Sequence, residues 1–207
     1  MKTPVRTRLL SALLSLVMLV SLLPVSVFAA EPASGTWEKV TEAQEDWSGQ
    51  YLIVYEKGSL IMDGSLSALD KEGNKVDVTI TDGKIVGDYA KYAFTIAPMT
   101  GGWSVQSASG KYISGKSGSN KIITGSTPEL NTITFADGNV KIASNNTTLQ
   151  YNAAATNGTR FRYYKSENQQ PVALYKLSTA PARQSGIVTD LTTLQNGDKV
   201  VVFNPAN

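Results

Sequence analysis

The sequence predicts an all-β fold. Apolar and polar residues alternate with the two-residue period of a β-strand in several short segments, and almost none shows the apolar period of a helix. Between such segments stand Asp82-Gly83, Asp137-Gly138 and Asn157-Gly158, dipeptides that take the positive φ angles of tight hairpin turns. Many short strands separated by turns are typical of a β-barrel or a β-sandwich.

Residues 1–29 have the three parts of a secretory signal peptide. A basic start precedes an apolar stretch at residues 9–23, and Val27 and Ala29 suit the −3 and −1 positions of a cleavage site. The apolar stretch is short for a membrane span and meets Pro24, which favours a cleaved signal over an anchor. We therefore expect a secreted or cell-surface protein, with no stable membrane insertion after cleavage.

Removal of the signal changes the net charge. The chain has 19 Lys and Arg, of which 3 lie in the signal, so 16 basic residues face 17 acidic ones and the mature charge is −1. No cluster of basic residues remains, which argues against nucleic acid as a partner. The chain has no Cys, so its stability has to come from burial rather than from disulfides.

The expected all-β module covers residues 37–177, after a polar leader at 30–36. Within the module, a single helical turn fits only at residues 41–46. The segments with strand-like alternation are Val76–Thr81, Tyr92–Ile96, Trp103–Val105 and Val140–Ile142.

The end of the chain repeats its beginning. Residues 188–203, VTDLTTLQNGDKVVVF, are a degraded copy of residues 40–55, VTEAQEDWSGQYLIVY, 148 positions later and without a gap. Residues 178–186 read as a linker, and residues 187–207 as the truncated start of a second β module, because a lone strand is not stable by itself. We therefore expect further domains of the same chain.

A weaker internal repeat bears on the architecture. The segment that starts at Phe94 resembles the one that starts at Ile133, and in their second halves Trp103 corresponds to Val140, 37 positions later. Repeats of this length, each made of a few short strands, favour a small closed barrel of the β-trefoil type over a sandwich.

Composition excludes several kinds of chemistry. The chain has no His and no Cys, which removes His-based general bases, Cys nucleophiles and zinc sites built on either residue. Residues 110–117, GKYISGKS, match the phosphate-loop pattern, but strand-like segments flank them where that loop needs a following helix. We expect no catalytic residue, no metal and no cofactor in this part of the chain.

The segment RFRYY, residues 160–164, is the most distinctive candidate for binding. Strand alternation places Phe161 and Tyr163 on one face and Arg160, Arg162 and Tyr164 on the other. If the first face belongs to the core, the second is a planar, hydrogen-bonding surface of the kind that recognition favours.

The candidate binding residues are Asn152, Arg162 and Tyr164, and the ligand class that they suit is an extracellular glycan, a neutral polysaccharide in particular. On a solvent-exposed face, replacement of Tyr164 by Ala would cost about 0.5 kcal/mol. The alternative interpretation is that the Arg residues pair with acidic residues of a neighbouring strand and that the Tyr covers the end of the barrel.

Several segments together resemble a known type of protein. GQYLIVYE, GKYI, LQYN, RFRYYKS and PVALYK resemble an uncharacterised β-rich module of large secreted proteins from gut bacteria. The final GDKVVVFNPAN resembles the opening of a module that, in Firmicutes proteins, often precedes a metallophosphatase of the nucleotidase type or cell-wall anchoring repeats. The resemblance implies an extracellular accessory domain without catalysis and supplies no ligand residues.

Two functions follow as hypotheses. The first is a noncatalytic accessory module, for binding or as a spacer, at the N-terminus of an exported multidomain bacterial protein. The alternative is the N-terminal fragment of a secreted metallophosphoesterase or nucleotidase whose catalytic domain lies beyond residue 207.

Overall fold

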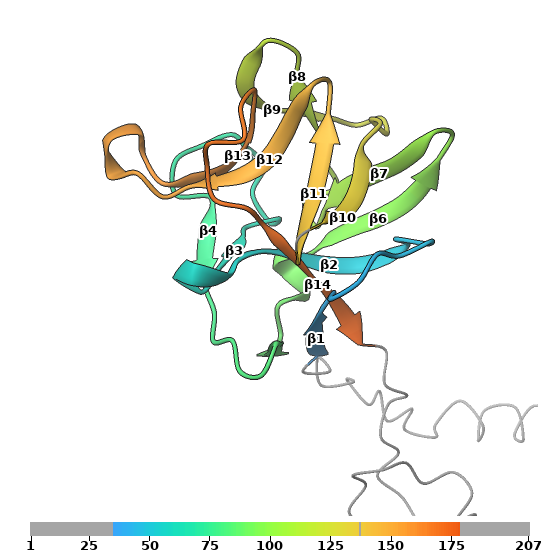
Figure 1. Cartoon of the computed structure of the whole chain (residues 1–207), viewed down its shortest axis with the longest axis vertical. Helices are drawn as coiled ribbons and strands as arrows, with labels where there is room; N and C mark the ends of the chain where they lie inside the picture. The colour runs from blue at the N-terminus through green and yellow to red at the C-terminus, as the bar shows by residue number, and fades with distance from the viewer. Residues whose placement is uncertain (1–34, 137, 179–207) are drawn as a thin grey trace, which may run out of the picture. The chain divides into compact units, whose positions relative to one another are not determined.

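The computed structural model describes residues 35–136 and 138–178, which form an all-β domain of two antiparallel sheets (Figure 1). The ten strands of the larger sheet are β1 (Gly35–Lys39), β2 (Gly49–Tyr55), β3 (Leu60–Met62), β4 (Lys75–Asp77), β5 (Lys84–Gly87), β6 (Phe94–Met99), β7 (Gly102–Ser107), β8 (Tyr112–Lys116), β9 (Ser119–Gly125) and β14 (Ala173–Ser178). The four strands of the smaller sheet are β10 (Thr132–Ala136), β11 (Asn139–Ser144), β12 (Thr147–Asn152) and β13 (Arg160–Tyr164).

The all-β class predicted from the sequence is confirmed, but the strand ladders of neither sheet close into a barrel. The larger sheet runs in the order β5-β1-β14-β2-β6-β7-β8-β9, with β3 and β4 branching from β2, and the smaller in the order β10-β11-β12-β13. The predicted signal peptide and second module lie outside the described residues, as does the predicted linker apart from Ser178, which ends β14. The predicted polar leader, residues 30–36, overlaps β1 at Gly35 and Thr36.

The tight turns follow the predicted residue types. Asp82 and Gly83 have φ angles of 50° and 69°, as a primed turn requires, and Gly138 has a φ of 74°. The third predicted turn is wrong in form, because Asn157 ends a short 3₁₀ helix and Gly158, with a φ of 66°, caps it. Asp137, the predicted partner of Gly138, lies outside the described residues. A further turn of this kind, between β11 and β12, is formed by Asn145-Asn146 with φ of 49° and 57°, because Asn tolerates this region better than most residues.

Two sequence expectations are wrong in detail. Residues 41–46 contain no helical turn and form a loop that delivers the buried Trp47, which is 2% exposed, to the core. The alternation at 76–81 continues past the end of β4, because the backbone N–H of Val78 donates to the carbonyl of Ser59 (2.9 Å) instead of continuing the ladder. The short 3₁₀ helices are η1 (Glu56–Gly58), η2 (Ala90–Tyr92) and η3 (Ala155–Asn157).

The internal repeat has a structural counterpart. Both ends of β11 lie 37 residues beyond the ends of β7, and each of these strands is the second strand of an antiparallel hairpin, with β6 or β10 as the first. Isolated bridges connect the two sheets at Trp103–Asn131 and Val140–Val172. The repeat in the sequence therefore corresponds to two hairpins, β6–β7 in the larger sheet and β10–β11 in the smaller sheet.

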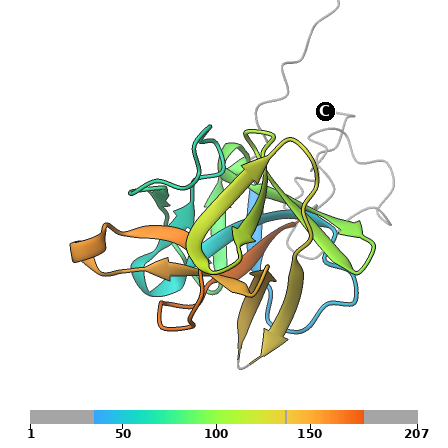
Figure 2. The same cartoon turned by 90° about the horizontal axis from the view of Figure 1, so that it is seen from above.

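Both sheets contribute to one core. Phe94 and Ile113 of the larger sheet belong to the same buried cluster as Ile142, Leu149 and Phe161 of the smaller one, and each is at most 1% exposed. The loop at the tip of the β12–β13 hairpin, coloured orange, protrudes from this packed region in Figures 1 and 2.

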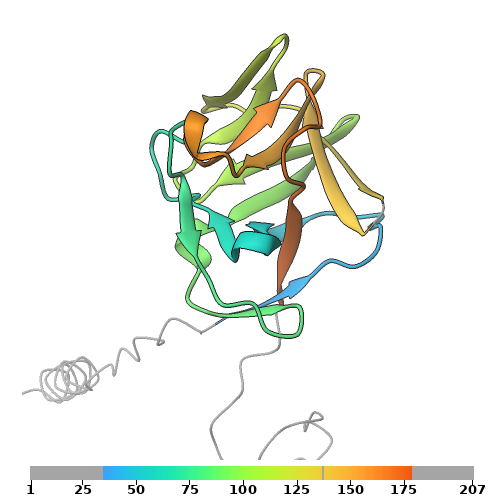
Figure 3. The same ribbon diagram turned by 60° about the vertical axis from the view of Figure 1, so that its left-hand side comes forward.

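The described chain begins and ends on neighbouring strands. β1 lies between β5 and β14, and Figure 3 shows β1 and β14 side by side. Trp37 of β1 is 1% exposed and packs in a second cluster with Leu52, Ile85 and Tyr175. This pairing joins the two ends of the domain, which favours a compact unit.

Several tyrosines are buried in ways that disfavour ionisation. Burial raises the pKa of Tyr51 to about 12, and nearby Asp46 raises it further. Burial also raises the pKa of Tyr163, and the pKa of Tyr175 is raised by burial and by its hydrogen bond to Glu56. The hydroxyl of Tyr51 has no hydrogen-bond partner among the described residues.

We expect these tyrosines to make the fold sensitive to alkali. Because their folded pKa values are raised, the stability they contribute is complete below the unfolded pKa of about 10 and is lost as pH rises above it. The chain has no His, the side chain that normally titrates near neutral pH. The melting temperature should therefore stay constant between pH 6 and 9 and fall above pH 9.

The matched variant is Tyr51→Phe, which removes a buried hydroxyl that has no partner. It should melt at the same temperature as wild type or higher at neutral pH, and it should lose less stability at pH 11. A wild-type melting temperature that is unchanged from pH 8 to 12 would contradict the conclusion that ionisation of buried tyrosines destabilises the fold.

Candidate functional site

The three residues predicted to bind, Asn152, Arg162 and Tyr164, border one hollow in the protein surface. The hollow has a volume of about 410 Å³ and lies where β9, β12, β13 and the segment before β14 come together. Its lining consists of Asn120, Asn152, Ala154, Arg160, Arg162, Tyr164 and Gln169.

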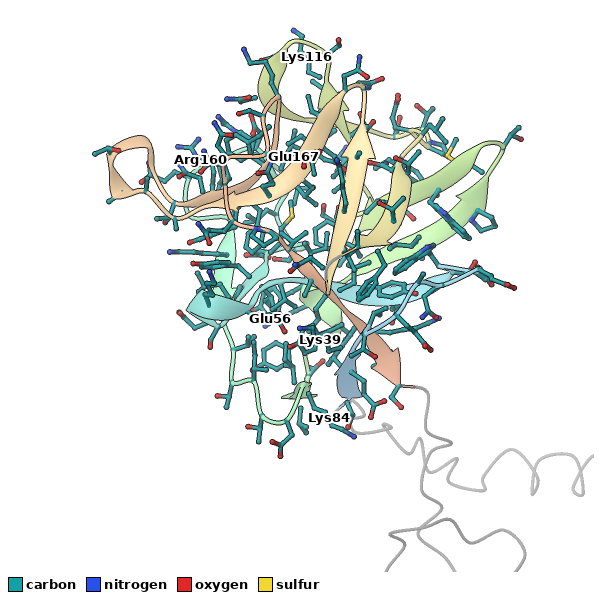
Figure 4. The ribbon with its side chains drawn as sticks, in the orientation of Figure 1. Lys39, Glu56, Lys84, Lys116, Arg160 and Glu167 are labelled. Atoms are coloured by element: carbon teal, nitrogen blue, oxygen red, sulfur yellow. The ribbon has the colours of Figure 1, made fainter. Side chains whose placement is uncertain are left out.

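The strand alternation predicted for residues 160–164 is confirmed for the core face. Phe161 and Tyr163 are fully buried, whereas Arg160 and Arg162 are half-buried on the opposite face. The register of β12 and β13 places Asn152 opposite Arg160. Figure 4 shows Arg160 beside the β12–β13 hairpin. The strand geometry thus brings the polar residues of two neighbouring strands to one place.

Tyr164 is more buried than the sequence predicts. The residue is only 7% exposed, so the solvent-exposed face for which a cost of about 0.5 kcal/mol is expected on replacement by Ala is not present. Loss of a buried aromatic ring costs about 3 kcal/mol or more. The Tyr164 hydroxyl has no hydrogen-bond partner in the part of the chain that the structure describes, and unlike the Tyr51 hydroxyl it is not fully buried, so it is accessible from the hollow that Tyr164 borders.

The Tyr164 hydroxyl should act as a neutral hydrogen-bond donor. Burial raises its pKa, and the positive charges of Arg162 and Arg160 offset only part of that effect. At neutral pH the group therefore keeps its proton and can donate it to a ligand.

Arg162 is held by an acidic residue from a distant part of the chain. Its Nε donates to Oδ1 of Asp70 at 2.7 Å, and the same oxygen accepts the backbone N–H of Ile122 in β9 at 3.2 Å. The Arg162 and Asp70 side chains are 22% and 18% exposed. The alternative noted from the sequence, pairing of an Arg with an acid, thus applies to Arg162, although Asp70 lies in a loop rather than a strand.

The pairing through Nε leaves the end of the guanidinium uncommitted. Among the described residues, the two terminal nitrogens of Arg162 have no hydrogen-bond partner. Arg162 therefore combines a structural contact at one edge with available donors at the other.

Asn152 has a structural role in addition to bordering the hollow. Its Nδ2 donates to the carbonyl of Gly158 (3.2 Å), and its Oδ1 accepts the backbone N–H of Ala154 (2.9 Å). These bonds shape the turn that follows β12. Asn152 is 5% exposed, so we assign it to the wall of the hollow rather than to direct ligand contact.

Sequence reasoning missed Asn120 and Gln169. The Oδ1 of Asn120 accepts the backbone N–H of Lys165 (3.0 Å), which connects β9 to the end of β13. The Gln169 side chain has no partner among the described residues, while its backbone N–H donates to Gln150 (2.9 Å). Neither residue stands in a sequence pattern that distinguishes it. Packing of β9 against β13 brings Asn120 to the hollow, and pairing of the segment before β14 with β12 brings Gln169 there.

A buried amide fixes the loop that supplies Asp70. Asn74 is fully buried, and its Nδ2 donates to the carbonyls of Leu69 (2.7 Å) and Phe161 (2.8 Å). Its Oδ1 accepts the backbone N–H of Phe161 (2.8 Å), and the N–H of Gly73 donates to Thr159 (2.9 Å). The loop between β3 and β4 is therefore bonded directly to β13.

The phosphate-loop pattern serves packing. Its residues lie on the turn before β8, on β8 itself and on the turn into β9, with no helix after them. A Cβ atom on Gly115 would collide with the Thr147 side chain, and the Gly115 carbonyl accepts the Nδ2 of Asn145 (2.8 Å). The second glycine of the pattern thus allows close contact with the turn between β11 and β12.

Two further searches of the structure are negative within its described part. Residues 35–136 and 138–178 contain no group of three or more acidic side chains placed to hold a metal ion. Over the same ranges, no helix is long and apolar enough to cross a membrane.

No protein-family model matches the chain, and neither a curated protein nor a solved structure matches it. The resemblance to a module of large secreted gut-bacterial proteins therefore stays a prediction, of which the structure supports only that the domain is β-rich.

Replacement of Asn74 by Ala should destabilise the domain by about 2–4 kcal/mol, because it leaves buried backbone groups of β13 and the loop without partners. Urea unfolding measures this change. The matched control is Asn168→Ala on the exposed segment before β14, which should stay within about 0.5 kcal/mol of wild type. Equal stabilities of the two variants would contradict the role of Asn74.

Proposed function

We propose that the protein is an exported, noncatalytic accessory module that binds a carbohydrate in the hollow between β9, β12 and β13. The observation that carries this proposal is the Tyr164 hydroxyl, which has no hydrogen-bond partner among the described residues and borders a hollow whose lining residues are almost all polar, while the rest of Tyr164 is buried. A hydroxyl that is held in place by a buried ring and has no partner within the described part of the protein is available to donate to a ligand in the hollow.

The size and chemistry of the hollow suit a saccharide. Its volume of about 410 Å³ lies within the range of small-molecule sites. Six of its seven lining residues carry hydrogen-bonding side chains, and the amide and guanidinium groups among them are planar. Sugar hydroxyls both donate and accept hydrogen bonds. The Gln169 amide can therefore donate to them or accept from them, whereas the Arg162 guanidinium can only donate.

We also propose that the fold is β-trefoil-like rather than a sandwich. The strands from β2 onward, with β5 set aside, divide into three successive groups of four: β2-β3-β4-β6, β7-β8-β9-β10 and β11-β12-β13-β14. The outer strands of these groups follow one another around a ring in the order β14-β2-β6-β7-β10-β11.

The isolated bridges support this ring. Trp103–Asn131 connects β7 to the residue before β10, and Val140–Val172 connects β11 to the residue before β14, at the two points where continuous ladders are interrupted. In this arrangement the hairpins β8–β9 and β12–β13 occupy equivalent places in two of the groups, and the hollow lies where they meet.

Retention of the protein on insoluble polysaccharides tests the function. Wild type should be retained on at least one of them, and Tyr164→Phe, which keeps the ring and removes the hydroxyl, should bind about tenfold more weakly through loss of one hydrogen bond. Both proteins should melt at the same temperature, since the hydroxyl has no intramolecular partner among the described residues.

Tyr89→Phe is the matched control, because Tyr89 lies at the start of η2 and does not border the hollow, and its binding should equal that of wild type. No retention of wild type on any polysaccharide, or equal retention of Tyr164→Phe, would contradict the proposal. Release of soluble sugar during the assay would contradict its noncatalytic part.

A further inference from the structure

The lining of the hollow carries positive charge without acidic residues. Arg160 and Arg162 are among the seven lining residues, and none of the seven is Asp or Glu. Asp70 lies behind Arg162 and bonds its Nε, whereas Glu72 is 3.9 Å from a terminal nitrogen of Arg160 and its side chain is 69% exposed. Both acidic residues thus approach the arginines from outside the lining, and no carboxylate is among the residues that border the hollow.

The Asp70 contact gives the Arg162 guanidinium a fixed orientation. Asp70 is itself held by the backbone N–H of Ile122, so the acceptor on one side of the guanidinium cannot move freely. The terminal nitrogens on the other side form a planar fork of donors, which matches the two oxygens of a carboxylate. An arginine oriented in advance loses less conformational entropy when it binds an anion.

A second donor lies in the same hollow. The Tyr164 hydroxyl keeps its proton at ordinary pH because burial of the residue raises its pKa, and the charges of Arg162, Arg160 and Asp70 all act on it. A neutral hydroxyl donor in the same hollow as the terminal nitrogens of Arg162 can donate to the same anion, and a carboxylate accepts charge-assisted hydrogen bonds from the guanidinium that are stronger than those of a neutral sugar hydroxyl.

We propose that the hollow binds a saccharide that bears a carboxylate, such as a uronic acid residue, with the carboxylate on the terminal nitrogens of Arg162 and on the Tyr164 hydroxyl. Gln169 and Asn120 border the rest of the hollow and would meet the sugar hydroxyls. This inference rests on the proposed carbohydrate function and replaces the neutral polysaccharide expected from the sequence with an acidic one.

Titration calorimetry on the unchanged protein tests the ligand class. The probes are an oligomer of galacturonic acid, its methyl ester, a sulfated oligosaccharide and a neutral glucose oligomer. The acid should bind at least tenfold more tightly than the ester, and its affinity should fall with added salt. The sulfated sugar should bind more weakly than the acid, because a planar carboxylate fits the guanidinium fork better. Acetate alone should bind far more weakly than the oligomer.

The outcomes separate the two proposals. Equal binding of acid and ester, or preference for the neutral or sulfated oligomer, overturns carboxylate recognition and leaves carbohydrate binding intact. Binding of acetate as tight as that of the oligomer shows a simple anion site and overturns recognition of a saccharide. No binding of any probe here, together with no retention on polysaccharides, overturns both.

Variants then assign the residues. Arg162→Lys keeps the charge and an ion pair to Asp70 but lacks the planar fork, so it should weaken binding of the acid at least tenfold. Lys84→Gln removes one positive charge from an exposed ion pair with Glu38 on β5, which does not border the hollow, and should leave binding unchanged. Equal losses in the two variants would show attraction by net charge alone and would overturn the assigned geometry.

Discussion

The bond between the Asn74 side chain and the backbone of Phe161 is the interaction on which the candidate site depends. β13 is the last strand of the smaller sheet, and one buried amide from 87 residues earlier satisfies both the N–H and the carbonyl of Phe161. A side chain thus takes the place of a neighbouring strand. Because Asp70 lies on the same loop, four residues before Asn74, this bond also sets where the partner of Arg162 stands.

Local patterns predicted the elements of the site, and long-range packing decided their roles. The alternation in residues 160–164 predicted which side chains enter the core, and Asp82-Gly83 predicted a turn, because strand pleat and turn geometry depend on adjacent residues alone. The pairing of Arg162 with Asp70 spans 92 residues and leaves no mark in either segment. The burial of Tyr164 was missed for the same reason, since alternation gives the side of a strand on which a residue lies but not what packs over it.

Structural and binding roles coexist within the same residues. Asn152 uses both ends of its amide to shape a turn, while Arg162 uses one edge of its guanidinium to hold the loop of Asp70. The uncommitted donors and acceptors in the lining of the hollow include the Tyr164 hydroxyl, the end of the Arg162 guanidinium and the Gln169 amide. Their supports are strands and buried bonds, so the hollow should change little on binding.

A nuclear magnetic resonance titration with the galacturonic acid oligomer tests most directly whether this hollow is the binding site. The Nε–H signal of Arg162 and the side-chain amide signals of Asn120 and Gln169 report on three separate walls of the hollow. If the oligomer binds there, these signals shift together and saturate at one ligand concentration, while that of Asn168 stays in place. Saturable shifts confined to another surface, with these three signals unchanged, would contradict the assignment of the hollow.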